Sequence, residues 1–361
     1  MSTTAVLHVT GARPNFPKAA PVIRALDRFG IRQRLIHTGQ HYDERMSEVF
    51  FRQLGLREPD INLGVGSGSH ASQTADIMTR LEELLVADPP GLTVVYGDVN
   101  SALAAALVAT KLHIPVAHVE AGLRSFDRSM PEEVNRIIVD RVSDLLFATS
   151  PDAAVHLGNE GISADKVFLV GNPMIDTLLD NLDRFDIAGI RAALALPDRY
   201  VVATLHRPAN VDDPADANDL VKAMHAVADQ IPVILPLHPR GRGHLENAGL
   251  SSHRALRVIE PLGYIEFVSL VRGAAAVVTD SGGVQEETTM LGVPCLTLRP
   301  NTERPITITH GTNRLVSRAA LAEVVASTLE AERPATWRTP PLWDGKAGER
   351  IAEIIASELR L

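Results

Sequence analysis

The 361-residue sequence has little cysteine, no long apolar run and no excess of positive charge. Its single cysteine, Cys295, cannot form an internal disulfide, and its apolar neighbours predict a buried thiol. The longest apolar run, 102–109, is far shorter than the roughly 20 residues that a membrane-spanning helix needs. The first residues lead directly into a predicted strand, without the basic start and apolar core of a signal peptide. These absences favour a cytoplasmic protein without a membrane partner.

The formal net charge of −9 argues against a nucleic-acid partner, because such binding needs a basic face. The 13 histidines never fall at metal-ligand spacing with cysteine or carboxylate residues, so we predict no required metal. The sequence also has no Gly-x-Ser-x-Gly nucleophile motif and no Walker phosphate loop. A bound anion would therefore need a local cluster of positive groups.

The length and an alternating pattern predict two α/β domains. A single core stops growing at roughly 250–300 residues, so a chain of 361 residues favours two. Short, wholly apolar runs alternate with helical stretches, which is typical of parallel sheets covered on both faces. The predicted strands are 6–9, 34–37, 93–96, 115–119, 145–148, 167–170, 200–205, 233–237, 256–259, 276–279 and 295–298, and the predicted helices include 17–29, 71–85, 101–112, 131–142 and 348–361. The sequence thus predicts two doubly wound, Rossmann-like domains, joined near the polar stretch 172–198.

Reactive side chains or glycines follow six of the predicted strands. Ligands of open α/β sheets bind beyond the carboxyl ends of the strands. The six strand ends are Gly11-Ala12-Arg13, Gly97-Asp98, Glu120-Ala121-Gly122, His206-Arg207, His238-Pro239 and Asp280-Ser281-Gly282-Gly283. Because both halves of the chain contribute, these ends predict a ligand-binding cleft between the two domains.

The segment 280–287 is the sharpest local signal. Its paired glycines let the backbone approach a ligand, and the N-terminus of the helix that follows suits a phosphate. Glu287 lies one helical turn beyond Gly283, where its carboxylate can accept hydrogen bonds from ribose hydroxyls. The alternative is an ordinary helix capped by Ser281. Lys18 is predicted to lie in the first turn of a helix, where its positive charge is unfavourable beside the positive end of the helix dipole. A bound pyrophosphate would offset this repulsion. The alternative is a solvated surface lysine.

Taken together, the motifs resemble those of the non-hydrolysing UDP-N-acetylglucosamine 2-epimerases. The motifs are Gly11-Ala12-Arg13-Pro14, Gly97-Asp98, 118–124 (HVEAGLR), 130–136 (MPEEVNR), 280–287 (DSGGVQEE) and 302–305 (TERP), with 344–348 (DGKAG) near the end. The resemblance implies an α/β fold of the GT-B type with a Rossmann-like domain over 1–171, a second over 172–345, and a helix over 346–361 that crosses back to the first. It also implies a homodimer.

The resemblance also assigns roles to individual residues. The family's catalytic positions match Asp98, Glu120, Glu132 and His206. Its UDP-binding positions match Arg13, Lys18, Ser281, Gly282, Gly283, Glu287 and Arg304, with Phe267 at the uracil and His238 as a further cleft histidine. Without the resemblance, a helix cap, a favourable helix dipole or a surface loop would explain several of these residues.

The reaction implied by the family interconverts UDP-N-acetylglucosamine and UDP-N-acetylmannosamine. UDP leaves first, the proton on carbon 2 is removed to give 2-acetamidoglucal, and protonation of the opposite face followed by return of UDP gives the epimer. Both bonds re-form on the enzyme, so we expect no cofactor. The alternatives are an epimerase of a related UDP-diacetamido-uronate sugar, a GT-B glycosyltransferase, a hydrolysing epimerase and a non-catalytic nucleotide-sugar sensor.

A regulatory site is also expected by resemblance. Many bacterial members of the family are activated by a second UDP-N-acetylglucosamine molecule, bound by a segment that here contains Gln40, His41 and Tyr42, together with Arg207. Tyr42 and Asp43 replace cationic or amide side chains, and the acid would repel a second pyrophosphate. We therefore expect an activator site that is weakened or rebuilt.

Overall fold

The computed structural model describes residues 5–39, 51–211, 213–237, 242–332 and 337–359. The chain divides into two compact units, Met1–Asp180 with Pro341–Leu361, and Asn181–Pro340. The last segment of the chain therefore belongs to the first unit. Among the described residues, no helix is both long enough and apolar enough to span a membrane.

The first unit is built on a seven-stranded parallel sheet with the order β3-β2-β1-β4-β5-β6-β7. Its strands are β1 (Val6–Thr10), β2 (Gln33–His37), β3 (Ile61–Asn62), β4 (Leu92–Tyr96), β5 (Val116–Ala121), β6 (Leu145–Ala148) and β7 (Val167–Leu169). The chain order reverses direction between β1 and β4. Such a reversal is where open α/β sheets bind ligands.

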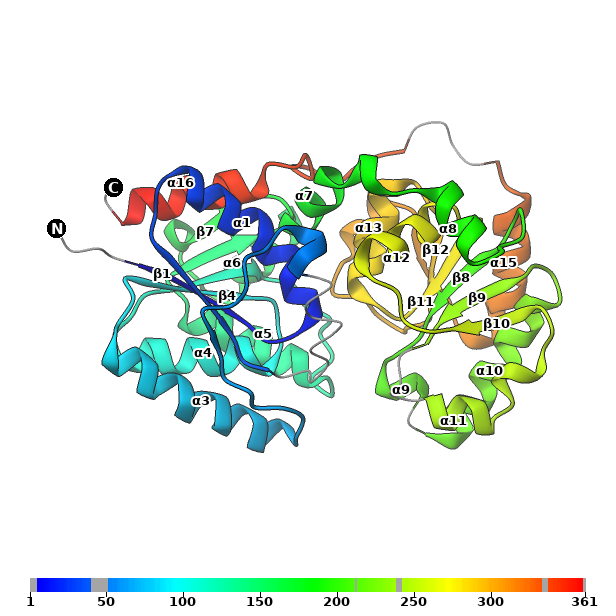
Figure 1. The fold of residues 1–361 in the computed structure, drawn as a ribbon, viewed down its shortest axis with the longest axis horizontal. Coiled ribbons are helices and arrows are strands. Elements are labelled where there is room, and N and C mark those ends of the chain that lie inside the picture. The colour runs from blue at the N-terminus through cyan, green and yellow to red at the C-terminus, as the bar shows by residue number, and fades with distance from the viewer. Residues whose placement is uncertain (1–4, 40–50, 212, 238–241, 333–336, 360–361) are drawn as a thin grey trace. The chain divides into compact units, whose positions relative to one another are not determined.

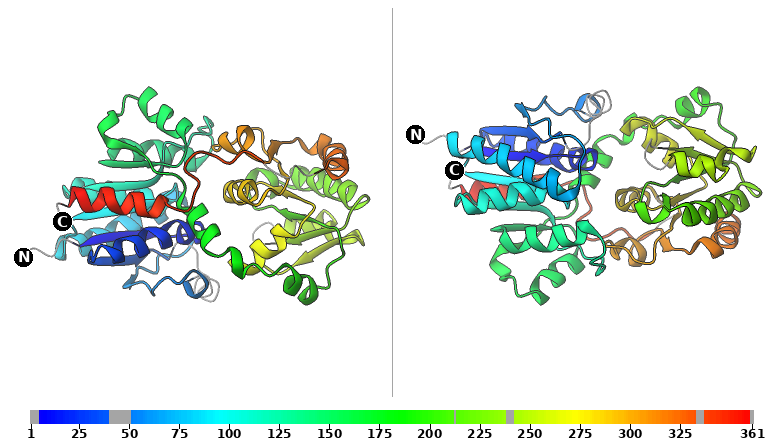
Figure 2. Two further views of the ribbon diagram at one scale, coloured as in Figure 1. Left: turned by 90° about the horizontal axis from the view of Figure 1, so that it is seen from above. Right: turned by 90° about the horizontal axis from the view of Figure 1, so that it is seen from below.

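Helices cover both faces of this sheet. They are α1 (Phe16–Arg28), α3 (His70–Ala87), α4 (Asn100–Lys111), α5 (Pro131–Val142), α6 (Pro151–Asn159), α7 (Pro173–Asp180) and α16 (Ala347–Glu358). α1 and α16 lie side by side on one face, and α3, α4 and α5 lie on the other (Figure 1, Figure 2). The second group buries Ile77, Ala105 and Val139 against β1 and β4, as expected for strands that are apolar on both faces.

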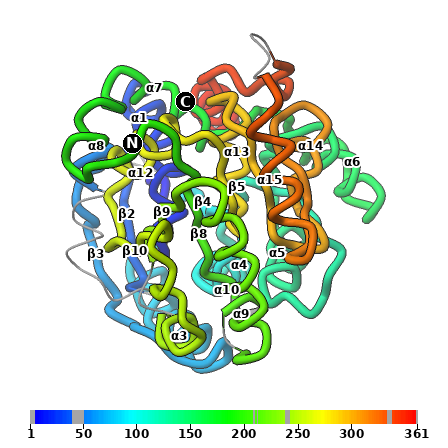
Figure 3. Tube along the Cα trace, turned by 90° about the vertical axis from the view of Figure 1, so that its right-hand side faces the viewer, coloured from blue at the N-terminus to red at the C-terminus, as the bar shows by residue number. Residues whose placement is uncertain are grey.

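The second unit is also built on a parallel sheet, with six strands in the order β10-β9-β8-β11-β12-β13. Figure 3 labels β8, β9 and β10 of this sheet. They are β8 (Val201–Thr204), β9 (Val233–Pro236), β10 (Leu256–Ile259), β11 (Ala276–Thr279), β12 (Cys295–Thr297) and β13 (Asn313–Leu315). Here the order reverses between β8 and β11. Cys295 is fully buried, as predicted.

The helices of the second unit are α8 (Ile187–Ala193), α9 (Pro208–Val211), α10 (Pro214–Ala228), α11 (Arg242–Asn247), α12 (Tyr264–Arg272), α13 (Gly282–Leu291), α14 (Ile306–Thr309) and α15 (Leu321–Glu330). Alternate residues of β8 point into different cores. Val201 and Ala203 pack with α10 and α15, whereas Val202 packs with α8 and α12. This alternation explains why the strand sequence is apolar throughout.

Local sequence signals explain where several helices begin. α1, α5 and α10 carry proline in their first turn, where the missing N–H group costs nothing. Asp213 caps α10 by accepting hydrogen bonds from two backbone N–H groups, and Ser69 caps α3. The predicted strands and helices are all present within a few residues of their predicted ends, whereas β3 and β13 were not predicted.

Candidate functional site

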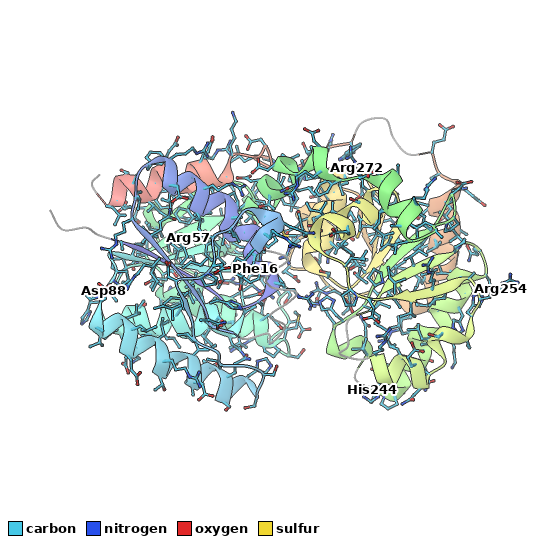
Figure 4. The ribbon with its side chains drawn as sticks, in the orientation of Figure 1. Phe16, Arg57, Asp88, His244, Arg254 and Arg272 are labelled. Carbon is cyan, nitrogen blue, oxygen red and sulfur yellow. The ribbon has the colours of Figure 1, made fainter. Side chains whose placement is uncertain are left out.

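In the first unit, Asn15 ties together the ends of the two strands at the reversal point. Its side-chain oxygen accepts hydrogen bonds from the N–H groups of Gly11 and Ala12, both at 3.0 Å. Its amide nitrogen donates to the carbonyl of Tyr96, at the end of β4, over 2.8 Å. Asn15 thereby fixes the loop that carries Arg13, which is half-buried in a short 3-10 helix (Arg13–Asn15). Phe16, which is labelled in Figure 4, begins the next helix. Its ring packs on those of His37 and Phe51.

Lys18 and Glu120 form a buried ion pair beside this loop, with only 7% and 3% of their side chains exposed. Lys18 lies in the first turn of α1, and Glu120 lies near the end of β5. Lys18 is therefore not a solvated surface lysine. A Cβ atom on Gly97 would lie 2.8 Å from the Glu120 carboxylate and 3.0 Å from the Lys18 ammonium. Gly97 has a φ of +63°, a left-handed conformation that favours glycine, and a Cβ atom there would also press on the buried ion pair.

Asp98 pairs with Arg136 of α5 and does not cap α4, whose N-cap residue is Val99. The Arg136 side chain is almost fully buried, and its Nε atom also donates to Glu133 over 3.0 Å. Glu132, the predicted catalytic acid, lies half-buried in the first turn of the same helix. The next residue, Glu133, is buried.

Glu133 holds the loop that follows β5. It accepts hydrogen bonds from the backbone N–H groups of Ser125 and Phe126 and from the Ser125 hydroxyl. Sequence reasoning named neither Glu133 nor Arg136 as a functional residue. The spacing of 133 and 136 on one helix face was the signal available for finding this pair.

The reversal point of the second unit carries His206 and Asp280. His206 Nδ1 lies 2.8 Å from the fully buried Asp280 carboxylate, whereas about half of the His206 side chain is exposed (51%). The Asp280 carboxylate also accepts from the backbone N–H groups of His206 and Arg207. Burial alone would raise the pKa of Asp280, but His206, Asn210 and Arg207 lower it to about 2. An ionised Asp280 therefore orients the His206 ring through Nδ1.

The N-terminus of α13 is not capped by a side chain. Ser281 occupies the N-cap position but its hydroxyl makes no capping hydrogen bond, so the ordinary cap that sequence reasoning left open is not formed. The guanidinium of Arg304 lies close to Gly282, where a Cβ atom would be 2.3 Å from Nη1. A cation and a helix N-terminus together are the elements of an anion site.

Two buried carboxylates hold Arg304 at that place. Glu303 pairs with Arg304 Nη1, and Glu286 lies 2.8 Å from Arg304 Nε. Glu303 also pairs with Arg299 at 2.6 Å and with Arg207 at 3.6 Å. Burial raises the pKa of Glu303, but Arg304, Arg299 and Arg207 lower it well below its ordinary value. Glu303 and Glu286 were also missed by sequence reasoning.

Glu287 lies buried next to Tyr264 on α12. Burial raises the pKa of Glu287 to about 8, a hydrogen bond with Tyr264 lowers it, and the neighbouring charge of Glu286 raises it. Phe267, one turn further along α12, is half-buried against the apolar core of this unit. Gly283 and Val284 continue the first turn of α13.

Four residues of the predicted sites lie outside the described residues: Gln40, His41, Tyr42 and His238. Within the part of the chain that the structure describes, no group of three His, Cys, Asp or Glu side chains is placed to hold a metal ion. The site residues of the two units differ in their chemistry. Those of the first unit include carboxylates that could transfer protons, and those of the second unit include cations and a helix N-terminus that could bind a diphosphate.

Comparison with known proteins points to one family. The family model described as UDP-N-acetylglucosamine 2-epimerase matches residues 24–356. The chain is 42% identical to the UDP-N-acetylglucosamine 2-epimerase of Methanocaldococcus jannaschii, over 96% of this chain and 97% of that protein. It is also 42% identical to the UDP-2,3-diacetamido-2,3-dideoxy-D-glucuronate 2-epimerase of Pseudomonas aeruginosa, over 97% and 99%.

Solved structures extend the similarity to the fold. The crystal structure of the M. jannaschii enzyme in complex with UDP-GlcNAc and UDP has a TM-score of 0.92, and the comparison covers 98% of this chain and 99% of that chain. The UDP-GlcNAc-bound enzyme of Neisseria meningitidis, 30% identical, has a TM-score of 0.86 and covers 99% of both chains. The expected fold class, α/β of the GT-B type with two Rossmann-like domains, is confirmed. The chain belongs to the UDP-N-acetylglucosamine 2-epimerase family.

Proposed function

We propose that the protein is a non-hydrolysing UDP-N-acetylglucosamine 2-epimerase, which interconverts UDP-N-acetylglucosamine and UDP-N-acetylmannosamine. The observation that carries the proposal is the set of acidic groups at the reversal point of the first sheet. Asp98 follows β4 and Glu120 lies near the end of the adjacent strand β5, and each is paired with a cation from a helix, Arg136 and Lys18. Each carboxylate therefore lies beside a positive charge that fixes its position.

The chemistry explains why several acids are needed. Carbon 2 of an amino sugar is not beside a carbonyl, so its proton becomes acidic only after UDP leaves and carbon 1 becomes electron-poor. A base then removes the proton, giving 2-acetamidoglucal. Protonation must come from the opposite face to invert the centre, so one group accepts and another donates. Asp98, Glu120 and Glu132 are the candidates for these two roles, with His206 as a further proton carrier.

The second unit supplies the groups that stabilise the leaving diphosphate. Arg304 and the uncapped α13 N-terminus, with Ser281, Gly282 and Gly283, bind the phosphates, while Glu287 accepts from ribose and Phe267 packs on the uracil. The diphosphate stays bound while the sugar is glucal, which separates this enzyme from one that releases free sugar.

The second candidate is an epimerase of a UDP-diacetamido uronate. The Pseudomonas relative that carries that name is as similar to this chain, at 42% identity, as the M. jannaschii epimerase. The two substrates share UDP and the reacting carbon 2 and differ at carbons 3 and 6. The groups described above act on the shared parts, so they support both substrates.

One experiment separates the candidates. Purified enzyme is incubated with either UDP-sugar and no acceptor, and the products are identified by NMR. We expect UDP-N-acetylglucosamine to give UDP-N-acetylmannosamine. Neither incubation should release free UDP together with free sugar. Turnover of the uronate alone would favour the second candidate, and a requirement for an acceptor sugar would favour a glycosyltransferase.

We also propose that the protein is a homodimer in the cytoplasm. Light scattering tests the dimer, and the mass of a monomer would contradict it.

A further inference from the structure

The backbone of Glu120 adopts a conformation that residues with a side chain rarely occupy. Its φ is +75°, in the left-handed region, and the register between β5 and β6 shifts between Val119 and Ala121. A β-strand that continued regularly would turn the Glu120 side chain to a different direction. Neighbouring groups must therefore hold this residue in place, since the conformation is intrinsically unfavourable.

Asp140, in the last turn of α5, contacts the chain on both sides of Glu120. One carboxylate oxygen lies 2.6 Å from Nδ1 of His118, two residues before Glu120. The other accepts from the N–H group of Gly122, two residues after Glu120, over 3.1 Å. Asp140 thus bridges the strained residue without touching its carboxylate, which pairs with Lys18.

The same bridge reaches the turn that carries Asp98. His118 Nε2 lies 2.9 Å from the carbonyl oxygen of Gly97, which can only accept, so Nε2 donates. The N–H group of Gly97 in turn donates to the carbonyl of Val119. Asp140 and His118 therefore link the Gly97–Asp98 turn with the Glu120 segment.

Arg124 completes this cluster and keeps Asp140 charged. Its guanidinium lies 2.7 Å from the second carboxylate oxygen of Asp140 and also pairs with Glu160 at 2.7 Å. His118, Asp140 and Arg124 are each at most 2% exposed. Burial alone would raise the pKa of Asp140, but His118 and Arg124 lower it below its ordinary value. An ionised Asp140 accepts from the Gly122 N–H group and from Arg124 at once, while its other oxygen lies against the His118 ring.

We propose that Asp140 is a positioning residue for the epimerisation, which holds the strained backbone of Glu120 and, through His118, the Gly97–Asp98 turn. The inference rests on the proposed function, in which Glu120 and Asp98 act at the sugar. Asp140 itself touches neither acid. Its loss should displace both carboxylates slightly, and a misplacement of about 1 Å can cost roughly 100-fold in rate.

The test compares Asp140→Asn with Asp176→Asn. Asp176 is a buried aspartate of the same unit that accepts from the N–H group of Gly348, at the start of α16, over 2.7 Å. We expect Asp140→Asn to lower kcat roughly 10- to 100-fold, with KM and the UDP affinity from calorimetry little changed. Asp176→Asn should leave kcat near the wild-type value. Equal kcat values for the two variants would overturn the proposal.

A double variant separates positioning from general loss of stability. Because Asp140 acts partly through Glu120, Asp140→Asn should cost a smaller factor in kcat in a Glu120→Gln background than in the wild-type protein. Losses that multiply would show that Asp140 acts independently. If Asp140→Asn does not fold, His118→Gln breaks the same bridge and should give the same lowered kcat with unchanged UDP affinity; a normal kcat would contradict the proposal. Absence of epimerisation by the wild-type protein would instead overturn the proposed function.

Discussion

Replacing Gly282 by alanine should displace the arginine that we propose binds the diphosphate. A Cβ atom at this position would lie 2.3 Å from Arg304 Nη1, 2.8 Å from its Cζ and 2.8 Å from a Glu303 oxygen. A flexible guanidinium would ordinarily move away at little cost. Here it is 6% exposed and held by Glu303 and Glu286, so it cannot move without separating buried charges.

The expected loss follows from the hydrogen bonds that a displaced Arg304 no longer makes. Hydrogen bonds to charged groups contribute about 1.5–3 kcal/mol. Since about 1.4 kcal/mol corresponds to a tenfold change, UDP should bind roughly 10- to 150-fold more weakly. Overpacking of this kind also costs about 1–3 kcal/mol of folding free energy, so the unfolding midpoint should fall as well.

Calorimetry with UDP measures the first effect, and thermal unfolding measures the second. Gly243→Ala is the matched control, because this glycine lies in α11 of the same unit and its Cβ would meet no atom within 4 Å. The control should bind UDP normally. A Gly282→Ala protein that is folded and binds UDP as tightly as the control would refute the role given to Arg304.

The remaining predictions concern the acids and His206. Asp98→Asn, Glu120→Gln, Glu132→Gln and His206→Ala should each lower turnover by roughly 10²–10⁴ while the protein stays folded, as steady-state rates and circular dichroism can show. Near-normal turnover in any two would contradict the catalytic assignment. Because burial raises the folded-state pKa of Glu287 to about 8 from 4.5, its contribution to stability is full below pH 4.5 and is lost as pH rises toward 8. We therefore measure the thermal unfolding midpoint of the ligand-free protein between pH 4.5 and pH 8. The midpoint should fall less over this range in Glu287→Gln than in the wild-type protein. Parallel curves of midpoint against pH for the two proteins would show that Glu287 does not titrate there.

Much of the fold could be predicted from the sequence because its parallel strands are short and apolar on both faces. Val6–Thr10 and Leu92–Tyr96 are wholly buried, and the helices between such strands begin at recognisable proline or polar signals. The two missed strands are edge strands with polar residues. Ile61–Asn62 has only two residues, and Asn313–Leu315 has two exposed residues of three, so neither carries a hydrophobic pattern.

The candidate site was only partly predictable, because its ion pairs join residues far apart in the chain. The sequence analysis identified Lys18 and Glu120, but their direct pairing spans 102 residues and is not visible in the local sequence around either one. Likewise, the motif 302–305 contains Glu303 and Arg304, but the third partner, Glu286, comes from α13. Strand order determines which of these charges meet, and local patterns do not contain that information.

We propose that the protein removes the proton from carbon 2 of its UDP-sugar and replaces it with one from solvent. Incubation of the purified protein with UDP-N-acetylglucosamine in heavy water, followed by proton NMR, tests the claim most directly. We expect UDP-N-acetylmannosamine to form with deuterium at carbon 2, and Glu120→Gln to slow the exchange. An epimer that keeps its original carbon-2 hydrogen would show that the proton is not exchanged and that the proposed mechanism is wrong.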